Sequence, residues 1–262
     1  MRASASPLQR DRAATLADSP TTTAARLIVG SVAVAIAVHS APYLATLARG
    51  RRAQLLPRLA GIGPRNSVAL TFDDGPDPTS TPLFIEALGQ LGWSATFFVL
   101  GENVRRSPEI VRDLVAAGHE VAVHGDRHRS HLWRAAPDVV ADVRRARDTI
   151  ADVSGTTPIW FRPPHGALSA PSLLAARRCD LRLVLWSTWG RDWTSHATPD
   201  SVTAHIRRDL SPGATLLLHD TDCTSAPGAW RSALGALPLI ATLLAERGVT
   251  RVGTLTEHLG AT

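Results

Sequence analysis

Cysteine is nearly absent from this sequence of 262 residues, which contains only Cys179 and Cys223. The strand pattern described below places Cys179 before one strand and Cys223 after a later one. If those strands are parallel, the two thiols lie at opposite ends of the sheet, roughly 20 Å apart by the rise per strand residue. A disulfide needs Cα atoms within about 7 Å of each other. We therefore predict that the fold contains no disulfide.

Lysine is absent, so all 28 basic residues are arginines. Residues 1–52 hold seven Arg and two Asp, a net charge of +5, whereas residues 53–262 hold 21 Arg and 21 Asp or Glu, a net charge of zero. A nucleic-acid-binding domain normally carries a basic surface of its own. Because the excess charge lies outside the region that should fold, we expect no nucleic-acid partner.

Charged residues are missing from residues 27–48, a run of 22 residues between Arg26 and Arg49. Its length suits a transmembrane or signal-anchor segment, and a secretory signal cleaved near Ser40 or Ala41 is the competing interpretation. The arginines after the run favour an inside location for the C-terminal domain, but long domains can cross regardless. We expect a disordered tail over 1–26, a linker over 49–65 and a folded domain over 66–262.

From residue 66 onward, short apolar runs alternate with helix-like segments. We predict strands over 66–71, 94–99, 119–124, 158–161, 181–187, 214–219 and 250–254. We predict helices over 107–117, 137–152, 171–178, 198–210 and 228–248. The alternation, without internal repeats, indicates a parallel α/β fold, either a barrel or a doubly wound sheet.

Polar side chains occur at the carboxyl ends of the predicted strands. Thr71-Phe72-Asp73-Asp74-Gly75-Pro76 closes the first strand, and later ones end at His124, Arg162, Trp186 and His219. In parallel α/β folds the loops after the strands converge at this edge and form the active site. Two adjacent carboxylates repel each other unless a metal, a cation or a shared proton compensates.

Two histidines four residues apart, His124 and His128, provide a candidate metal site. Together with Asp74 they supply two imidazoles and one carboxylate, the pattern of a catalytic divalent metal, most often zinc. His131 offers a rival pairing with His128, and we expect a surface role for Asp126. A metal held in this way acidifies water and polarises a carbonyl group.

Hydrolysis at such a metal also needs a base and an acid. Asp73 is the candidate base, which Arg162 would hold ionised and oriented. His219 is the candidate acid, and Asp192 would orient its imidazole and raise its pKa. Both partners also have a purely structural interpretation: Arg162 would fix the Pro-Pro loop, and Asp192 would cap a helix. Ser187 and Ser211 suggest a serine hydrolase, but the sequence has no GxSxG motif.

The loop Phe161-Arg162-Pro163-Pro164-His165-Gly166 is stiffened by its two prolines. The backbone N–H of His165 is therefore a candidate donor to an oxyanion. Trp186, Trp189 and Trp193 cluster beside the proposed cleft, either as core residues or as a platform for a sugar.

Five motifs, TFDDG, HGDRH, FRPPHG, RDW and LLLHD, follow one another in an order that resembles the polysaccharide deacetylases of the NodB homology type, carbohydrate esterase family 4. The resemblance covers about residues 66–254. It implies a distorted (β/α)7-type barrel and metal-dependent removal of N-acetyl groups from N-acetylglucosamine-containing polysaccharides such as peptidoglycan or chitin-like glycans. It also implies roles by motif position: Asp73 as base, Asp74, His124 and His128 as metal ligands, His219 as acid, Arg162 and Asp192 as their tuning residues, and Trp193 and Leu217 as lining of the acetyl pocket.

Three positions depart from the family pattern. Gly125 stands where Ser or Thr is common, His165 where Tyr or Phe is usual, and Trp189 where Asp is frequent. None of them removes a core catalytic group, so we expect activity.

We expect the catalytic domain to lie outside the cytoplasm, either anchored to the membrane through residues 27–48 or secreted. The alternatives are an O-acetyl esterase on acetylated xylan-type glycans and a non-catalytic glycan-binding protein of the same fold.

Overall fold

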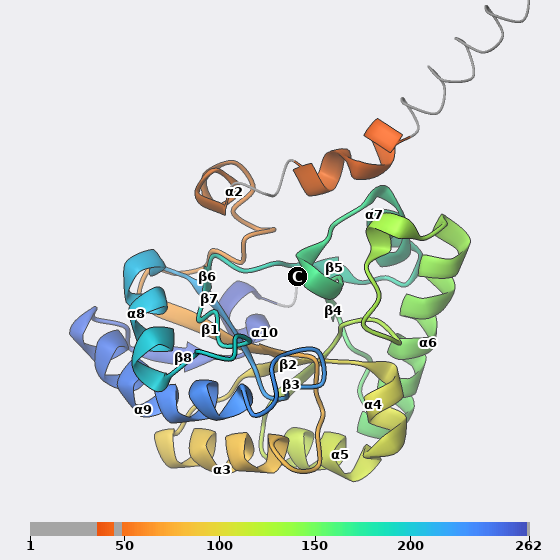
Figure 1. Cartoon of the computed structure of the whole chain (residues 1–262). Coiled ribbons are helices and arrows are strands. Elements are labelled where there is room, and N and C mark those ends of the chain that lie inside the picture. The colour runs from red at the N-terminus through yellow and green to blue at the C-terminus, as the bar shows by residue number, and fades with distance from the viewer. Residues whose placement is uncertain (1–35, 45–48, 261–262) are drawn as a thin grey trace, which may run out of the picture. The chain divides into compact units, whose positions relative to one another are not determined.

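A parallel β-sheet runs through the centre of the computed structural model, which describes residues 36–44 and 49–260 (Figure 1). Its strands are β1 (Ser67–Asp73), β2 (Thr96–Val99), β3 (Glu120–Val123), β4 (Trp160–Phe161), β5 (Arg182–Leu183), β6 (Thr188–Trp189), β7 (Thr215–His219) and β8 (Arg251–Gly253). Their order is β5-β4-β3-β2-β1-β7-β6, and β8 pairs with the start of β1. All of these pairs are parallel, as the sequence predicts.

The sheet curls toward a barrel. Strands β5 and β6 lie at its two ends, although only residues 184–187 separate them in the chain. A connection this short reaches less than about 20 Å even when fully extended, so the two ends of the sheet must approach each other. Strands β8 and β2 pair one after the other with Ser67–Ala69 and Thr71–Asp73 of β1. This arrangement is the distorted (β/α) barrel that the sequence predicts.

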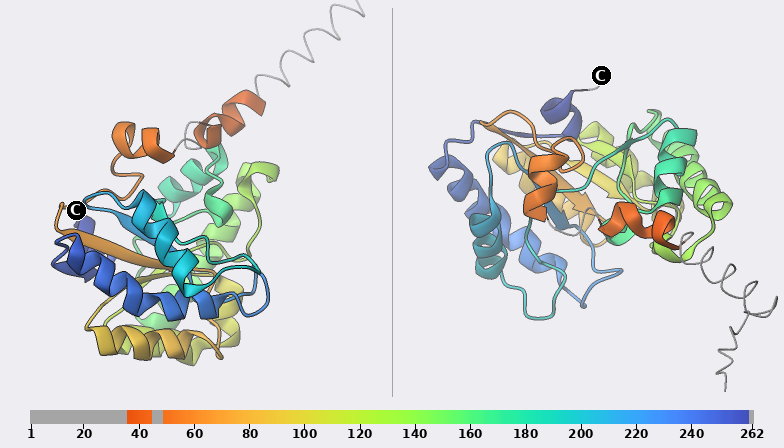
Figure 2. Two further views of the ribbon diagram at one scale, coloured as in Figure 1. Left: turned by 60° about the vertical axis from the view of Figure 1, so that its left-hand side comes forward. Right: turned by 90° about the horizontal axis from the view of Figure 1, so that it is seen from above.

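Helices pack around the outside of the sheet (Figures 1 and 2). They are α3 (Thr81–Leu91), α4 (Gly101–Arg106), α5 (Pro108–Ala116), α6 (Ala136–Ser154), α7 (Ala170–Arg178), α8 (Pro199–Asp209) and α9 (Trp230–Glu246). The short α10 (Leu255–Leu259) instead packs inside the curl through Leu255. The sequence predicts α5 to α9 to within two residues at each end, but it misses α3, α4 and α10. The predicted strand 181–187 is also wrong, because β5 ends at Leu183 and Trp186 lies in the connection to β6.

Alternation along the strands separates two cores, since successive strand residues face opposite sides of a sheet. Leu70 and Phe72 of β1 belong to the large core between sheet and helices. Ala69, by contrast, packs in a second core inside the curl, together with Phe98, Ala122, Trp160, Val184 and Leu255. Asp73 lies four residues after Ala69, so its side chain faces the same inner side of the sheet. For the same reason His124, two residues after Ala122, and Arg162, two residues after Trp160, face inward. The period of two thus directs polar side chains into the mouth of the barrel.

The segment predicted as a linker instead packs against the domain. Helix α2 (Arg49–Leu55) carries Arg52, which is buried and donates a hydrogen bond to the Trp186 carbonyl oxygen. Further along, Leu185 N–H donates to the Leu59 carbonyl at 2.7 Å. Residues 52–63 are therefore part of the folded unit His39–Thr262, and the linker prediction is wrong for this stretch.

The described residues include no helix with the length and apolarity of a membrane span. The predicted tail 1–26 and most of the predicted anchor 27–48 lie outside the described residues. Both cysteines are free thiols, which confirms the prediction of no disulfide.

Candidate metal centre and active site

A cavity of about 280 Å³ opens at the carboxyl ends of the strands. It is lined by acids, imidazoles and indoles: Asp73, Asp74, His124, His128, His165, Gly166, Trp186, Trp189, Trp193, Leu217, His219, Thr224 and Ser225. Of the predicted site residues, only Arg162 and Asp192 are not part of this lining, and each contacts a lining residue from behind. The structure therefore brings all ten predicted residues together.

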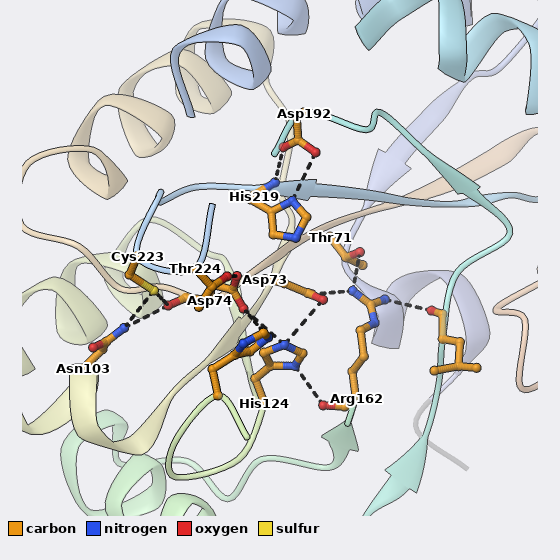
Figure 3. Close-up of polar contacts among 12 residues, drawn as sticks. Thr71, Asp73, Asp74, Asn103, His124, Arg162, Asp192, His219, Cys223 and Thr224 are labelled. Carbon is orange, nitrogen blue, oxygen red and sulfur yellow. Dashed lines mark hydrogen bonds and ion pairs between the residues drawn. The ribbon is translucent and has the colours of Figure 1, made fainter. Parts of the chain in front are cut away.

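The carboxylate of Asp74 faces two imidazoles (Figure 3). Its Oδ1 lies 3.2 Å from His124 Nε2 and 3.3 Å from His128 Nε2. The three ligand atoms lie within 4.8 Å of one another. Among the residues that the structure describes, no hydrogen-bond partner is found for the buried Oδ1 of Asp74, which is costly for a carboxylate oxygen unless a cation occupies the site. These residues therefore fit a divalent metal.

The protonation of the imidazoles suits metal binding. His124 Nδ1–H donates to the Arg162 carbonyl at 2.8 Å, which leaves the Nε2 lone pair directed at Asp74. Burial lowers the pKa of His128 to about 4, so this ring is neutral at physiological pH. Burial opposes ionisation of Asp74, yet the surrounding imidazoles, among them the charged His219, hold the pKa of its carboxyl below the ordinary range. A neutral imidazole and an ionised carboxylate are the forms that ligate metals.

Three side chains that the sequence did not reveal hold Asp74 in place. Thr224 Oγ1 donates to its Oδ2, and Asn103 Nδ2 donates to its backbone carbonyl at 2.9 Å. Cys223 Sγ lies 3.5 Å from the same carbonyl. Asn103 belongs to α4, and the other two belong to the loop between β7 and α9. No local motif marks them, since the contacts form between segments far apart in the chain.

Asp73 binds Arg162 through one carboxylate oxygen, and its other oxygen lies near His124. Its Oδ1 accepts a hydrogen bond from Arg162 Nη1 at 2.6 Å, whereas its Oδ2 lies 3.8 Å from His124 Nε2. The fully buried guanidinium also donates to Thr71 Oγ1 at 2.9 Å and to the Leu185 carbonyl at 2.8 Å. With three acceptors around it, Arg162 fixes the orientation of Asp73 and supplies a positive charge beside it.

His219 and Asp192 form a second ion pair at this edge of the sheet (Figure 3). Asp192 Oδ1 lies 3.1 Å from His219 Nδ1, and Asp192 Oδ2 accepts from the His219 backbone N–H at 2.6 Å. Burial opposes a positive charge on the imidazole, but the Asp192 carboxylate outweighs it and raises the pKa of His219 to about 10. The ring is therefore an imidazolium at neutral pH, as an acid requires.

An aromatic wall closes the cavity beside His219. The Trp186 and Trp189 rings stack with centroids 5.9 Å apart, Trp193 tilts against Trp189 at 4.9 Å, and the Trp193 ring meets His219 edge-on at 5.7 Å. Leu217 adds an aliphatic surface to this wall. The indoles thus pack against one another, as core residues do, and also line the cavity, where a sugar platform would lie.

Loop geometry accounts for two glycines of the motifs. Gly125 has φ +101°, a conformation that side-chain-bearing residues rarely adopt. A Cβ at Gly75 would come within 2.5 Å of Asp220 Oδ2. Both glycines therefore let the metal-binding loops follow their observed paths.

Three other polar residues lie outside the catalytic group. His131 is buried and lies 3.0 Å from Ser172 Oγ, apart from the metal ligands. The surface role expected for Asp126 is wrong, because its buried carboxylate pairs with Arg105 at 2.7 Å and with a second arginine of α6. Ser187 lines a separate cavity, and its Oγ accepts from the Thr215 backbone N–H at 3.0 Å, so it is not placed as a nucleophile.

The chain is similar in sequence and fold to known deacetylases. The sequence model described as polysaccharide deacetylase matches residues 60–184. A chitooligosaccharide deacetylase of Bradyrhizobium sp. (strain ANU 289) is 38% identical over 59% of this chain and 70% of its own length. A peptidoglycan-N-acetylglucosamine deacetylase of Bacillus cereus is 33% identical over 58% of this chain and 72% of its own length. Among solved structures, the Bc1960 peptidoglycan N-acetylglucosamine deacetylase superposes with a TM-score of 0.70 at 29% identity, covering 78% of this chain and 95% of that one.

Proposed function

Because the chain belongs to the polysaccharide deacetylase family, we propose that it is a metal-dependent hydrolase that removes N-acetyl groups from N-acetylglucosamine-containing polysaccharide, peptidoglycan or a chitin-like glycan, and releases acetate. The observation that carries this proposal is the buried Oδ1 of Asp74, which lies between two imidazoles without a hydrogen-bond donor in the described part of the chain. An arginine-bound carboxylate on one side and an aspartate-bound imidazolium on the other supply a base and an acid around it.

Asp74, His124 and His128 would hold the metal, which we propose to be Zn²⁺ from its preference for two imidazoles and a carboxylate. When bound, it supplies a Lewis acid at the acetyl carbonyl and lowers the pKa of water. We also propose that the catalytic domain works outside the cytoplasmic membrane, either anchored or secreted. This location rests on the uncharged run 27–48 of the sequence.

The reaction is the addition of water to an acetamide carbonyl followed by cleavage of the C–N bond. Asp73 accepts the proton of the attacking water through Oδ2, because Arg162 occupies its Oδ1. The backbone N–H of His165 would donate to the carbonyl oxygen as negative charge develops on it. His219 gives its proton to the departing amine nitrogen, and the Asp192 carboxylate stabilises the imidazolium until that transfer. Leu217 and Trp193 would enclose the acetyl methyl group.

Acetate release from a panel of glycans tests this function. Chitin oligomers, peptidoglycan and acetylated xylan should be compared with the metal-loaded protein, with the protein after a chelator, and after metal is added back. We expect release from the N-acetylated glycans, loss with the chelator and recovery with Zn²⁺. His219→Ala should lower turnover by at least about two orders of magnitude, the scale of a lost acid.

The same panel separates the alternatives. Release from acetylated xylan alone would identify an O-acetyl esterase. Glycan binding without any metal-dependent release of acetate would identify a non-catalytic binding protein. Turnover by His219→Ala at the wild-type rate would contradict the role given to that imidazole.

A further inference from the structure

A second hollow of about 450 Å³ adjoins the active site. It is lined by Leu100, Glu102, Asn103, Arg106, Arg127, His128, Arg129, Cys223 and Thr224. His128 and Thr224 line both spaces, so the hollow begins directly beyond a metal ligand and the hydroxyl that holds Asp74. A glycan residue bound in the cavity would therefore place its neighbour in the chain near this hollow.

The hollow has an excess of positive charge. Arg106 and Arg127 both approach the same carboxylate, with Glu102 Oε2 at 3.5 Å from Arg106 Nη2 and 3.7 Å from Arg127 Nε. Glu102 can neutralise only one of the two guanidiniums. Arg129 is exposed, and no ion pair is found for it among the residues that the structure describes. Three arginines and one glutamate leave about two positive charges in a domain whose sequence is otherwise balanced.

The three arginines come from two segments of the chain that meet beside His128. Arg106 ends α4, whereas Arg127 and Arg129 flank the ligand His128 in the loop after β3. Arg105, the neighbour of Arg106, is instead paired with the buried Asp126, which anchors the two segments to each other. The segments that carry the three arginines therefore meet at one rim of the active site.

We propose that this hollow binds a carboxylate carried by the sugar next to the N-acetylglucosamine that is deacetylated. Guanidinium groups bind carboxylates through paired charge-assisted hydrogen bonds. In peptidoglycan that sugar carries a lactyl ether, whose carboxylate is either free or extended by an acidic stem peptide, whereas chitin offers no charge. The hollow therefore selects anionic glycans over neutral ones. This inference rests on the proposed glycan substrate, and it identifies which class of glycan the site prefers.

The test uses tetrasaccharides of alternating N-acetylglucosamine and N-acetylmuramic acid in three forms: with free lactyl carboxylates, with the same groups amidated, and with stem peptides attached. Dissociation constants are measured by calorimetry on the His219→Ala protein, which should not turn over, and kcat/KM is measured on the wild type. Arg129→Gln and an Arg106→Gln/Arg127→Gln/Arg129→Gln triple variant are compared with Arg247→Gln. Arg247 is an exposed residue at the end of α9, just before β8, and so lies at the amino ends of the strands.

We expect the free acid to bind more tightly than the amide, with the preference falling as salt is raised. Arg129→Gln should weaken binding of the acid by roughly two- to fivefold, the range of an exposed ion pair, and the triple variant should abolish the preference. Neither should change binding of the amide, and Arg247→Gln should change nothing. Tighter binding of the peptide form alone, also lost in the triple variant, would place the carboxylate on the stem.

Equal affinity for acid and amide, or equal losses for both in the arginine variants, would overturn the proposed carboxylate site. Failure of the proposed function looks different. In that case the wild type releases no acetate from any tetrasaccharide, while the binding comparison still decides whether the hollow selects anions.

Discussion

Asp73 and Asp74 are adjacent in the chain, but their side chains have different partners. Asp73 extends the inward series of β1 and pairs with Arg162. Asp74 follows the strand in a left-handed conformation, φ +80°, which turns its carboxylate toward His124 and His128. Arg162 relieves the repulsion between the two neighbouring carboxylates on one side, and the metal proposed at Asp74 would relieve it on the other. This single backbone turn places Asp73 beside an arginine, as suits a base, and Asp74 between two imidazoles, as suits a metal ligand.

At the same scale, the Asp192 carboxylate pairs with His219, the proposed acid. His219 must be protonated to donate, so activity should be lost as pH rises through its pKa, which Asp192 raises to about 10. Asp192→Asn removes the negative charge and should move this alkaline loss of kcat/KM to lower pH. A pH profile of both proteins measures the shift. An alkaline limb that stays in place would show that another group controls it.

At the scale of elements, the sequence predicts the polar edge of the sheet because most of the proposed catalytic residues follow recognisable strands. The positions of His124, Arg162 and His219 can be predicted in this way from the pattern of strands alone. Those of Thr224 and Asn103 cannot, because these residues approach Asp74 through a long loop and a separate helix. The packing of helix α2 could not be predicted either, because its arginine-rich sequence does not show the apolar face of a typical packed helix.

Arg52 shows what α2 contributes. Its buried guanidinium lies 5.5 Å from the centre of the Trp186 ring and donates to the Trp186 carbonyl. Arg52→Ala should lower the free energy of unfolding by about 1–3 kcal/mol, because a buried hydrogen-bonded group and its packing are lost. Urea unfolding measures this change. The exposed Arg58 provides the control, and Arg58→Ala should change stability by less than about 0.5 kcal/mol. If the two variants unfold alike, α2 does not support the domain.

At the scale of the whole molecule, the metal site joins segments that are distant in the sequence. Asp74 follows β1, both histidines follow β3, and Thr224 follows β7. A cation bound by the folded state alone must therefore stabilise the fold. The unfolded chain does not hold these ligands together, so the effect reports the assembled site.

Zn²⁺ should accordingly raise the free energy of unfolding by about 2.7 kcal/mol at a hundredfold excess over its dissociation constant. Denaturant unfolding with and without the ion measures the gain. Asp113→Asn, on the exposed face of α5, should retain it. An equal gain in a variant that lacks both His124 and His128 would mean that the ion binds elsewhere.

The most direct test of the account is to compare metal binding and turnover in Asp73→Asn and Asp74→Asn. Asp73→Asn should bind Zn²⁺ within about threefold of the wild type and yet lose at least about two orders of magnitude in turnover, because it lacks only the base. Asp74→Asn should bind the metal at least roughly tenfold more weakly, as expected when the coordination shell is damaged, and lose activity with it. Equal loss of metal in both variants, or wild-type turnover by Asp73→Asn, would contradict the division into one base and one ligand.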